Sequence, residues 1–90
     1  MNRAVVSVIG KDTVGIIARV SALLSQRQAN ILDISQSVLQ DMFAMIMLVD
    51  VGAMSVSFAE LSGELTALGE ELGMTIHVMR EDVFQSMHRI

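Results

Sequence analysis

The chain contains no cysteine, no tryptophan and no tyrosine, and it has three phenylalanines among its 90 residues. Without cysteine it can form neither disulfides nor thiolate metal sites, and it has no thiol nucleophile. Without tryptophan or tyrosine it lacks the usual aromatic platform for stacking nucleic-acid bases. Its six Lys and Arg residues are scattered singly and the formal net charge is −4, so we expect no direct nucleic-acid binding.

Long apolar runs are also missing, because none approaches the roughly 20 residues that cross a bilayer. The amino-terminal residues have the pattern of a strand and not of a signal peptide, so we expect no membrane contact and a cytoplasmic location. Apolar residues nevertheless make up 52% of the chain, which is high for so small a domain. We therefore expect some of them to be buried against a second copy, in a homodimer or a higher homo-oligomer.

The apolar spacing predicts a single domain that begins with a strand and a helix. Residues 3–9 are largely β-branched and indicate a strand, and an amphipathic helix follows from Ile16. Residues 30–40 alternate between apolar and polar, as in a half-exposed edge strand. Residues 42–51 are apolar on both faces, which indicates a central strand, and Gln40 with Asp41 predicts a tight turn between the two.

The second helix is the most clearly marked element. Ser57 and Glu60 have the spacing of a capping box, leucines follow at helical intervals, and Gly73 suits the left-handed position that ends a helix. Residues 74–80 then form the last predicted strand. The order β-α-β-β-α-β predicts an α+β, ferredoxin-like sandwich, with a four-stranded antiparallel sheet and both helices on one face.

The second face of this sheet would be apolar and would need a cover. Val5, Ile9 and Met79 are expected to lie on it, together with one side of the 42–51 strand. We divide the chain into a domain of residues 1–80 and a tail of residues 81–90, whose apolar residues have the spacing of a short helix. The tail or a partner subunit could cover this face.

The junction between the first strand and the first helix is the candidate binding site. Gly10 and Gly15 bracket a polar loop where backbone N–H groups point outward at the positive end of a helix dipole, which suits a small anionic group. Alternatively, Asp12 or Thr13 simply caps the helix, and Gly15 serves backbone geometry or close packing. Asn30 is likewise either a ligand contact or a turn residue after the first helix.

The run Gly10-Lys11-Asp12-Thr13-Val14-Gly15-Ile16, followed by Ala29-Asn30-Ile31, resembles the ACT domain, a small regulatory module of amino-acid metabolism. The resemblance covers residues 3–80. With its tail, the chain is also similar to a group of small bacterial stand-alone ACT proteins and to the ACT halves of the glycine-cleavage-system transcriptional repressor.

The resemblance implies an effector site between two subunits. One chain would supply Gly10, Lys11, Asp12, Thr13, Val14, Gly15 and Ile16, and the other would supply Asn30 and Ile31. Serine-binding members carry an amide-type residue at the Asp12 position, whereas this chain has a carboxylate. That carboxylate would either hold the ammonium group of an amino acid or repel its carboxylate.

These observations predict a non-enzymatic, amino-acid-sensing ACT homodimer that binds a small amino acid between its subunits and signals to a protein partner. The alternative is a protein–protein interaction module without a small-molecule ligand. We expect no cofactor and no metal, because His77 and His88 have no second ligand at metal-site spacing. We expect no catalysis either, because the serines have no His–Asp partnership at a recognisable spacing.

Overall fold

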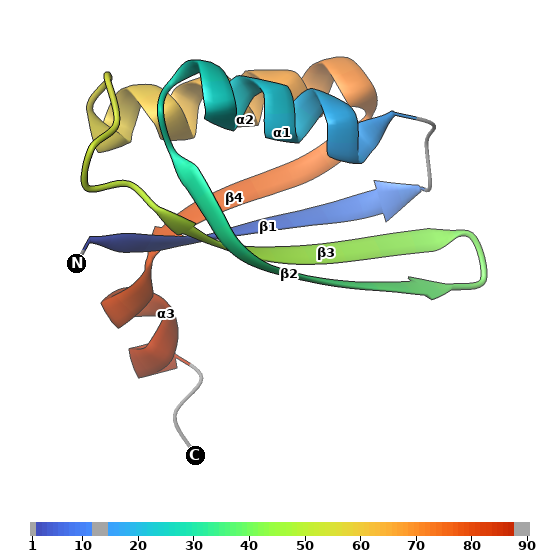
Figure 1. Ribbon diagram of the computed structural model, residues 1–90. Coiled ribbons are helices and arrows are strands. Elements are labelled where there is room, and N and C mark those ends of the chain that lie inside the picture. The colour runs from blue at the N-terminus through green and yellow to red at the C-terminus, as the bar shows by residue number, and fades with distance from the viewer. Residues whose placement is uncertain (1, 12–14, 88–90) are drawn as a thin grey trace.

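Figure 1 shows the computed structural model of the protein, which describes residues 2–11 and 15–87. The elements in chain order are β1 (Arg3–Lys11), α1 (Ile16–Gln26), β2 (Asn30–Leu39), β3 (Met42–Asp50), α2 (Phe58–Leu72), β4 (Met74–Arg80) and α3 (Glu81–Met87). The strands form one antiparallel sheet in the order β2-β3-β1-β4. The predicted βαββαβ ferredoxin-like fold is therefore confirmed, with β2 at an edge and β3 inside the sheet.

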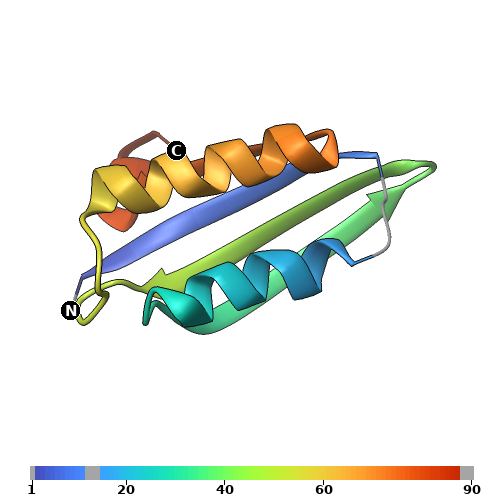
Figure 2. The ribbon, with the colours of Figure 1, turned by 90° about the horizontal axis from the view of Figure 1, so that it is seen from above.

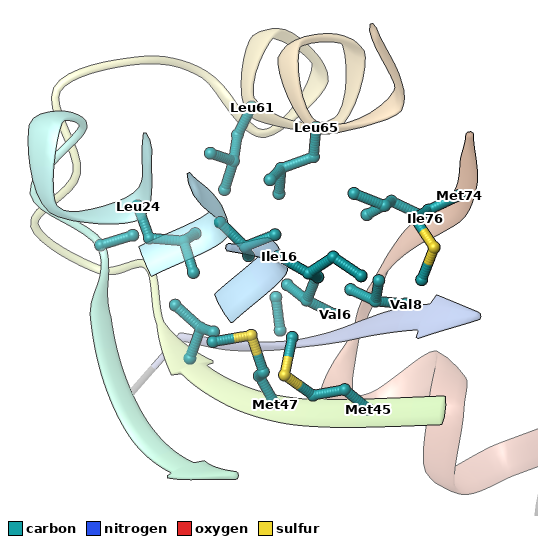
Figure 3. Packing of buried hydrophobic residues seen from close by; sticks show 14 of the residues in the cluster. Val6, Val8, Ile16, Leu24, Met45, Met47, Leu61, Leu65, Met74 and Ile76 are labelled. Carbon is teal, nitrogen blue, oxygen red and sulfur yellow. The ribbon is translucent and has the colours of Figure 1, made fainter. Parts of the chain in front are cut away.

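Helices α1 and α2 lie side by side over one face of the sheet (Figure 2). The core fills the space between these two layers, and its side chains point toward one another from both (Figure 3). Leu24, Leu61 and Leu65 from the helices are fully buried. Met45 and Met47 of β3 are fully buried as well, so these flexible side chains fill the core, as methionine commonly does.

Local sequence signals set both ends of α2. The backbone N–H of Glu60 donates to Ser57 Oγ at 3.1 Å, and the N–H of Ser57 donates to Glu60 Oε1 at 3.2 Å, which completes the predicted capping box. At the other end, Gly73 adopts the expected left-handed conformation, with φ of 73°.

The β2–β3 hairpin turns at Gln40 and Asp41, where Gln40 has a positive φ of 58°. A register shift between Ile31 and Asp33 marks a β-bulge near the start of β2. Among the described residues, no helix is long and apolar enough to cross a membrane.

The tail forms α3, which lies on the face of the sheet opposite α1 and α2 (Figure 1). We call this face the open face. Near α3, Val5 is 6% exposed, whereas Ile9 further along the same strand is 46% exposed. Helix α3, part of one of the two covers considered, therefore covers one part of this face, and the described chain leaves the rest open.

Candidate functional site

The structure places the described residues of the predicted loop at one end of the sheet. Gly10 and Lys11 end β1, and Gly15 and Ile16 begin α1. The remaining predicted loop residues, Asp12, Thr13 and Val14, lie outside the described residues.

Gly15 is the N-cap of α1 and has a left-handed conformation with φ of 87°. A β-carbon built on Gly15 would meet no atom within 4 Å among the described residues, its neighbours in the chain aside. Backbone conformation, and not close packing, therefore accounts for glycine at this position.

Glycine at position 10 is explained by close packing and not by backbone conformation. A β-carbon here would lie 2.6 Å from Met74 Sδ and 3.3 Å from the carbonyl oxygen of Gly73. Gly10 therefore allows the beginning of β4 to approach the end of β1. Packing against β4 is therefore sufficient to explain glycine at this position.

The first turn of α1 contains no acidic side chain. Its backbone N–H groups carry a partial positive charge that no carboxylate within that turn offsets. The side chain of Ile16 is 3% exposed and belongs to the core, so this residue presents its backbone to the outside. This helix end can accept an anionic group, provided that other contacts hold it.

Asn30 is the exposed first residue of β2. The turn after α1 is made by Gln28, which has φ of 61°, so the alternative that Asn30 merely forms this turn is wrong. An open hollow of about 440 Å³, here called the edge hollow, lies beside it. It is lined by Ser21, Ser25, Gln28, Ala29, Asn30 and Ile31.

Ser21, Ser25 and Gln28 were not among the predicted site residues. They stand at i, i+4 and i+7 along α1 and the turn after it, so helical spacing places them on one side of the helix. That polar row was the available signal in the sequence. The hollow adds hydroxyl and amide groups to the amide of Asn30, all able to donate and accept hydrogen bonds.

One chain does not bring the two parts of the predicted site together. In the sheet, Asn30 pairs with Asp50, and Asp50 pairs with Arg3, whereas Gly10 lies at the opposite end of β1. Arg3 and Gly10 are seven residues apart, which corresponds to about 23 Å along a strand. Figure 1 shows the same separation, because β1 ends and α1 begins at one end of the sheet and β2 starts at the other.

A second hollow, of about 400 Å³, lies between α1 and α2. Two lining residues form an ion pair between the helices, from Arg19 Nη2 to Glu71 Oε1 at 2.9 Å. Arg27, the residue after α1, pairs with Glu64 of α2, from Nη2 to Oε2 at 2.5 Å. Hydrogen bonds from the Arg27 guanidinium lower the pKa of Glu64, and the same contact raises the pKa of Arg27. These ion pairs bridge the helix layer at its partly exposed surface, where such pairs contribute little to stability.

The described residues contain no group of three His, Asp or Glu side chains arranged to hold a metal ion. His77 lies exposed in the middle of β4, and His88 lies outside the described residues. Two polar regions therefore remain as candidate binding regions, the start of α1 and the edge hollow.

The fold is that of an ACT domain, and the ACT-domain family model matches residues 2–79, so the chain belongs to this family. It belongs more narrowly with the UPF0237 proteins. A UPF0237 protein of Methanocaldococcus jannaschii is 54% identical over 90 residues, and one of Methanopyrus kandleri is 53% identical over the same length. Each alignment covers 100% of both chains.

Solved structures agree with this assignment. An ACT domain protein from Streptococcus pneumoniae superposes with a TM-score of 0.81 and 34% identity, covering 93% of this chain and 94% of that one. A protein described as a glycine cleavage system transcriptional repressor gives a TM-score of 0.74, covering 88% of this chain and 45% of that one. Its identity of 22% shows a shared fold alone, in keeping with the resemblance drawn from the sequence.

Proposed function

We propose that this protein is a regulatory, non-enzymatic ACT protein that acts as a homodimer, binds a small amino acid between its subunits and signals to a protein partner. The observation that carries the proposal is the position of the two polar regions at opposite ends of one sheet. A site that uses both needs two chains.

The edge strand β2 supplies a way to assemble such a pair. It is an outer strand of the sheet, so its free backbone groups can pair with another strand. If β2 pairs antiparallel with the β2 of a second copy, Asn30 of one chain approaches Leu39 of the other. Leu39 pairs with Met42, and Met42 with Lys11, so this is also the end of the sheet where α1 begins.

Apolar side chains beside this edge favour the pairing. Ile34 and Val38 pair with the buried residues Met47 and Phe43, so they point toward the helix layer, yet they are 40% and 55% exposed. Ile17 of α1 is 38% exposed as well. A neighbouring chain along β2 would cover them, which removes apolar surface from water.

A free amino acid suits the resulting interface because it carries both charges. Its carboxylate would lie at the start of α1 of one chain, while Asn30 and the edge hollow of the other would receive its polar groups. One exposed helix-terminus contact contributes about 0.3–1 kcal/mol. Millimolar affinity already needs about 4 kcal/mol, so neither half alone would bind usefully.

The proposal can be tested by titration calorimetry with each of the twenty amino acids at millimolar concentration. In this proposal Asp12 holds the ammonium group of the amino acid. We expect heat with at least one small amino acid, and its loss in Asn30→Ala and Asp12→Ala. Gln26→Ala is the matched control, because Gln26 also carries an amide near the end of α1 but lines the hollow between the helices. No heat with any amino acid would contradict the proposal and favour a protein-interaction module instead.

A further inference from the structure

The open face of the sheet exposes large apolar side chains. Ile9 of β1 and Met42 and Ile46 of β3 are each 46% exposed there. Their neighbours along these strands point to the core instead, because successive side chains of a strand alternate between its faces. Contiguous apolar surface of this kind commonly marks an interaction site.

Helix α3 covers one end of this face. Arg3 Nε donates to Glu81 Oε1 at 2.8 Å, which ties the start of α3 to the start of β1. A cavity of about 260 Å³ lies between Phe84 of α3 and the strands, with Ile9 and Ile46 among its lining residues. Beyond α3, towards the β2–β3 hairpin, the face has no cover within the described chain, and we call this part the bare half (Figure 1).

On the described strands of the open face, the charged side chains lie at the margins, and Ile46 lies nearer the centre, beside the cavity under Phe84. Ile46 pairs with Ser7 on one side and Ser35 on the other, so its direct neighbours on this face are small and uncharged. Lys11 lies at the end of β1, and Asp33 lies on the edge strand. An uncharged centre within a polar margin is the usual composition of a protein interface.

The face is also complementary to a copy of itself. Each chain carries a helix on one half of the open face and an uncovered apolar surface on the other half. Phe84 of α3 lines the cavity against its own sheet, while Val83 next to it is 45% exposed, so α3 also presents one apolar side chain away from that cavity. Rotation by 180° about an axis in the sheet plane, perpendicular to the strands, places the α3 of a second chain over the bare half of the first.

We propose that two copies of this chain pack open face to open face, with the α3 of each lying on the bare half of the other. Four strands of about nine residues present a face of roughly 570 Å². The chain's own α3 already covers a part of this area. A standard interface buries about 800 Å² per partner, so the bare half approaches that size only together with the outer sides of α3. This contact goes beyond the proposed function, since it uses a different surface from the β2 edge and needs no amino acid.

The two contacts can be separated by measuring the mass of the full-length protein by light scattering. Ile46→Glu puts a charge on the open face, at a position that is 46% exposed. The matched Ile34→Lys puts a charge beside the β2 edge, at a position that is 40% exposed. With both contacts the wild type has four chains of 9.8 kDa, or about 39 kDa. Each variant should then give about half that mass, and the double variant a monomer.

Because Ile46 also lines the cavity beneath its own α3, a lower mass in Ile46→Glu supports the face-to-face contact only where Val83→Glu, at an exposed position of α3, lowers the mass as well. A mass unchanged by Ile46→Glu would overturn the face-to-face contact and assign the open face to a small apolar ligand or another protein. A mass unchanged by Ile34→Lys would overturn the edge pairing of the proposed function alone. Ile46→Ser provides a second variant in case the glutamate prevents folding, because serine already flanks this position on both strands. Circular dichroism establishes that each variant is folded.

A mixing experiment tests the position of α3. Val83→Glu and Met42→Lys should each lower the mass when alone, because each puts a charge into the contact. A mixture of the two chains should regain the wild-type mass, since the glutamate on α3 of one chain then meets the lysine on the bare half of the other. Failure of the mixture to recover would overturn this arrangement of α3.

Discussion

Gly63 and Gly69 of α2 provide a matched test of how tightly this helix packs against β4. Both lie inside the helix, and both would gain helix propensity on replacement by alanine. A β-carbon at Gly63 would meet nothing within 4 Å. A β-carbon at Gly69 would lie 2.7 Å from the carbonyl oxygen of Met74 and 3.0 Å from Ile76 Cγ1.

The expected effects have opposite signs. Alanine is favoured over glycine by about 0.8–1.0 kcal/mol in a helix interior, so Gly63→Ala should stabilise the protein by nearly that amount. Gly69→Ala gains the same propensity but overpacks the contact, which typically costs about 1–3 kcal/mol. The atom it meets belongs to the backbone and cannot rotate away, so we expect a net loss of about 1–2 kcal/mol.

Denaturant unfolding followed by circular dichroism measures both variants. For a domain of this size, 1 kcal/mol corresponds to about 4–8 °C in Tm, so the two variants should differ clearly in thermal unfolding too. Protein concentration and oligomeric mass must be matched, because association raises apparent stability. Stabilisation by Gly69→Ala equal to that of Gly63→Ala would refute the close contact between α2 and β4.

Three further predictions concern local features. Gly15→Ala should cost about 1–2 kcal/mol in unfolding free energy, because alanine is strained at positive φ, and an unchanged denaturation midpoint would argue against the left-handed N-cap. The lowered pKa of Glu64 means that its stabilising effect is present above the pKa it has when unfolded and is lost as pH falls through the lower folded value. Glu64→Gln should therefore reduce the drop in urea midpoint between neutral and acidic pH, and an identical drop would contradict a contribution from its pair with Arg27. Ser57→Ala should cost about 1 kcal/mol by removing the cap that holds the Glu60 N–H, and no change in calorimetric Tm would count against the capping box.

Features encoded within a few residues were predictable from the sequence. The boundaries of α2 follow from Ser57, Glu60 and Gly73, whose roles depend on hydrogen bonds and backbone angles within a single turn. The hairpin at Gln40 and Asp41 is similarly local. These signals and the alternation of apolar residues were sufficient to define the order of elements, and hence the fold.

The side-chain orientation at the start of β2 depends on a β-bulge that the sequence of β2 alone does not predict. Simple alternation assigns Leu32, Ile34, Gln36 and Val38 to one side of the strand. The register shift between Ile31 and Asp33 removes Leu32 from that series, because a bulge inserts a residue with no partner opposite. Its position is decided by pairing with β3, so a pattern within β2 alone cannot locate it.

The candidate site was predictable in part. The spacing of Gly10 and Gly15 located the strand-to-helix junction. It could not show which glycine is needed for close packing and which for its backbone conformation. Contact with Met74, distant in the sequence, explains Gly10, whereas the positive φ explains Gly15. The edge hollow was missed because Ser21, Ser25 and Gln28 are ordinary polar residues until β2 brings Asn30 beside them.

The geometry of the sheet makes the two proposed contacts compatible. The β2 edge lies at the side of the sheet, and the open face lies beneath it, so a chain bound at one surface leaves the other uncovered. Edge pairing would bring Asn30 of one chain to the α1 start of the other, whereas face packing would bury Ile9, Met42 and Ile46. Ligand binding should consequently depend on Ile34 and persist in Ile46→Glu. If Ile46→Glu abolished amino-acid binding while the protein remained folded and dimeric, the β2 edge would not be sufficient to form the site.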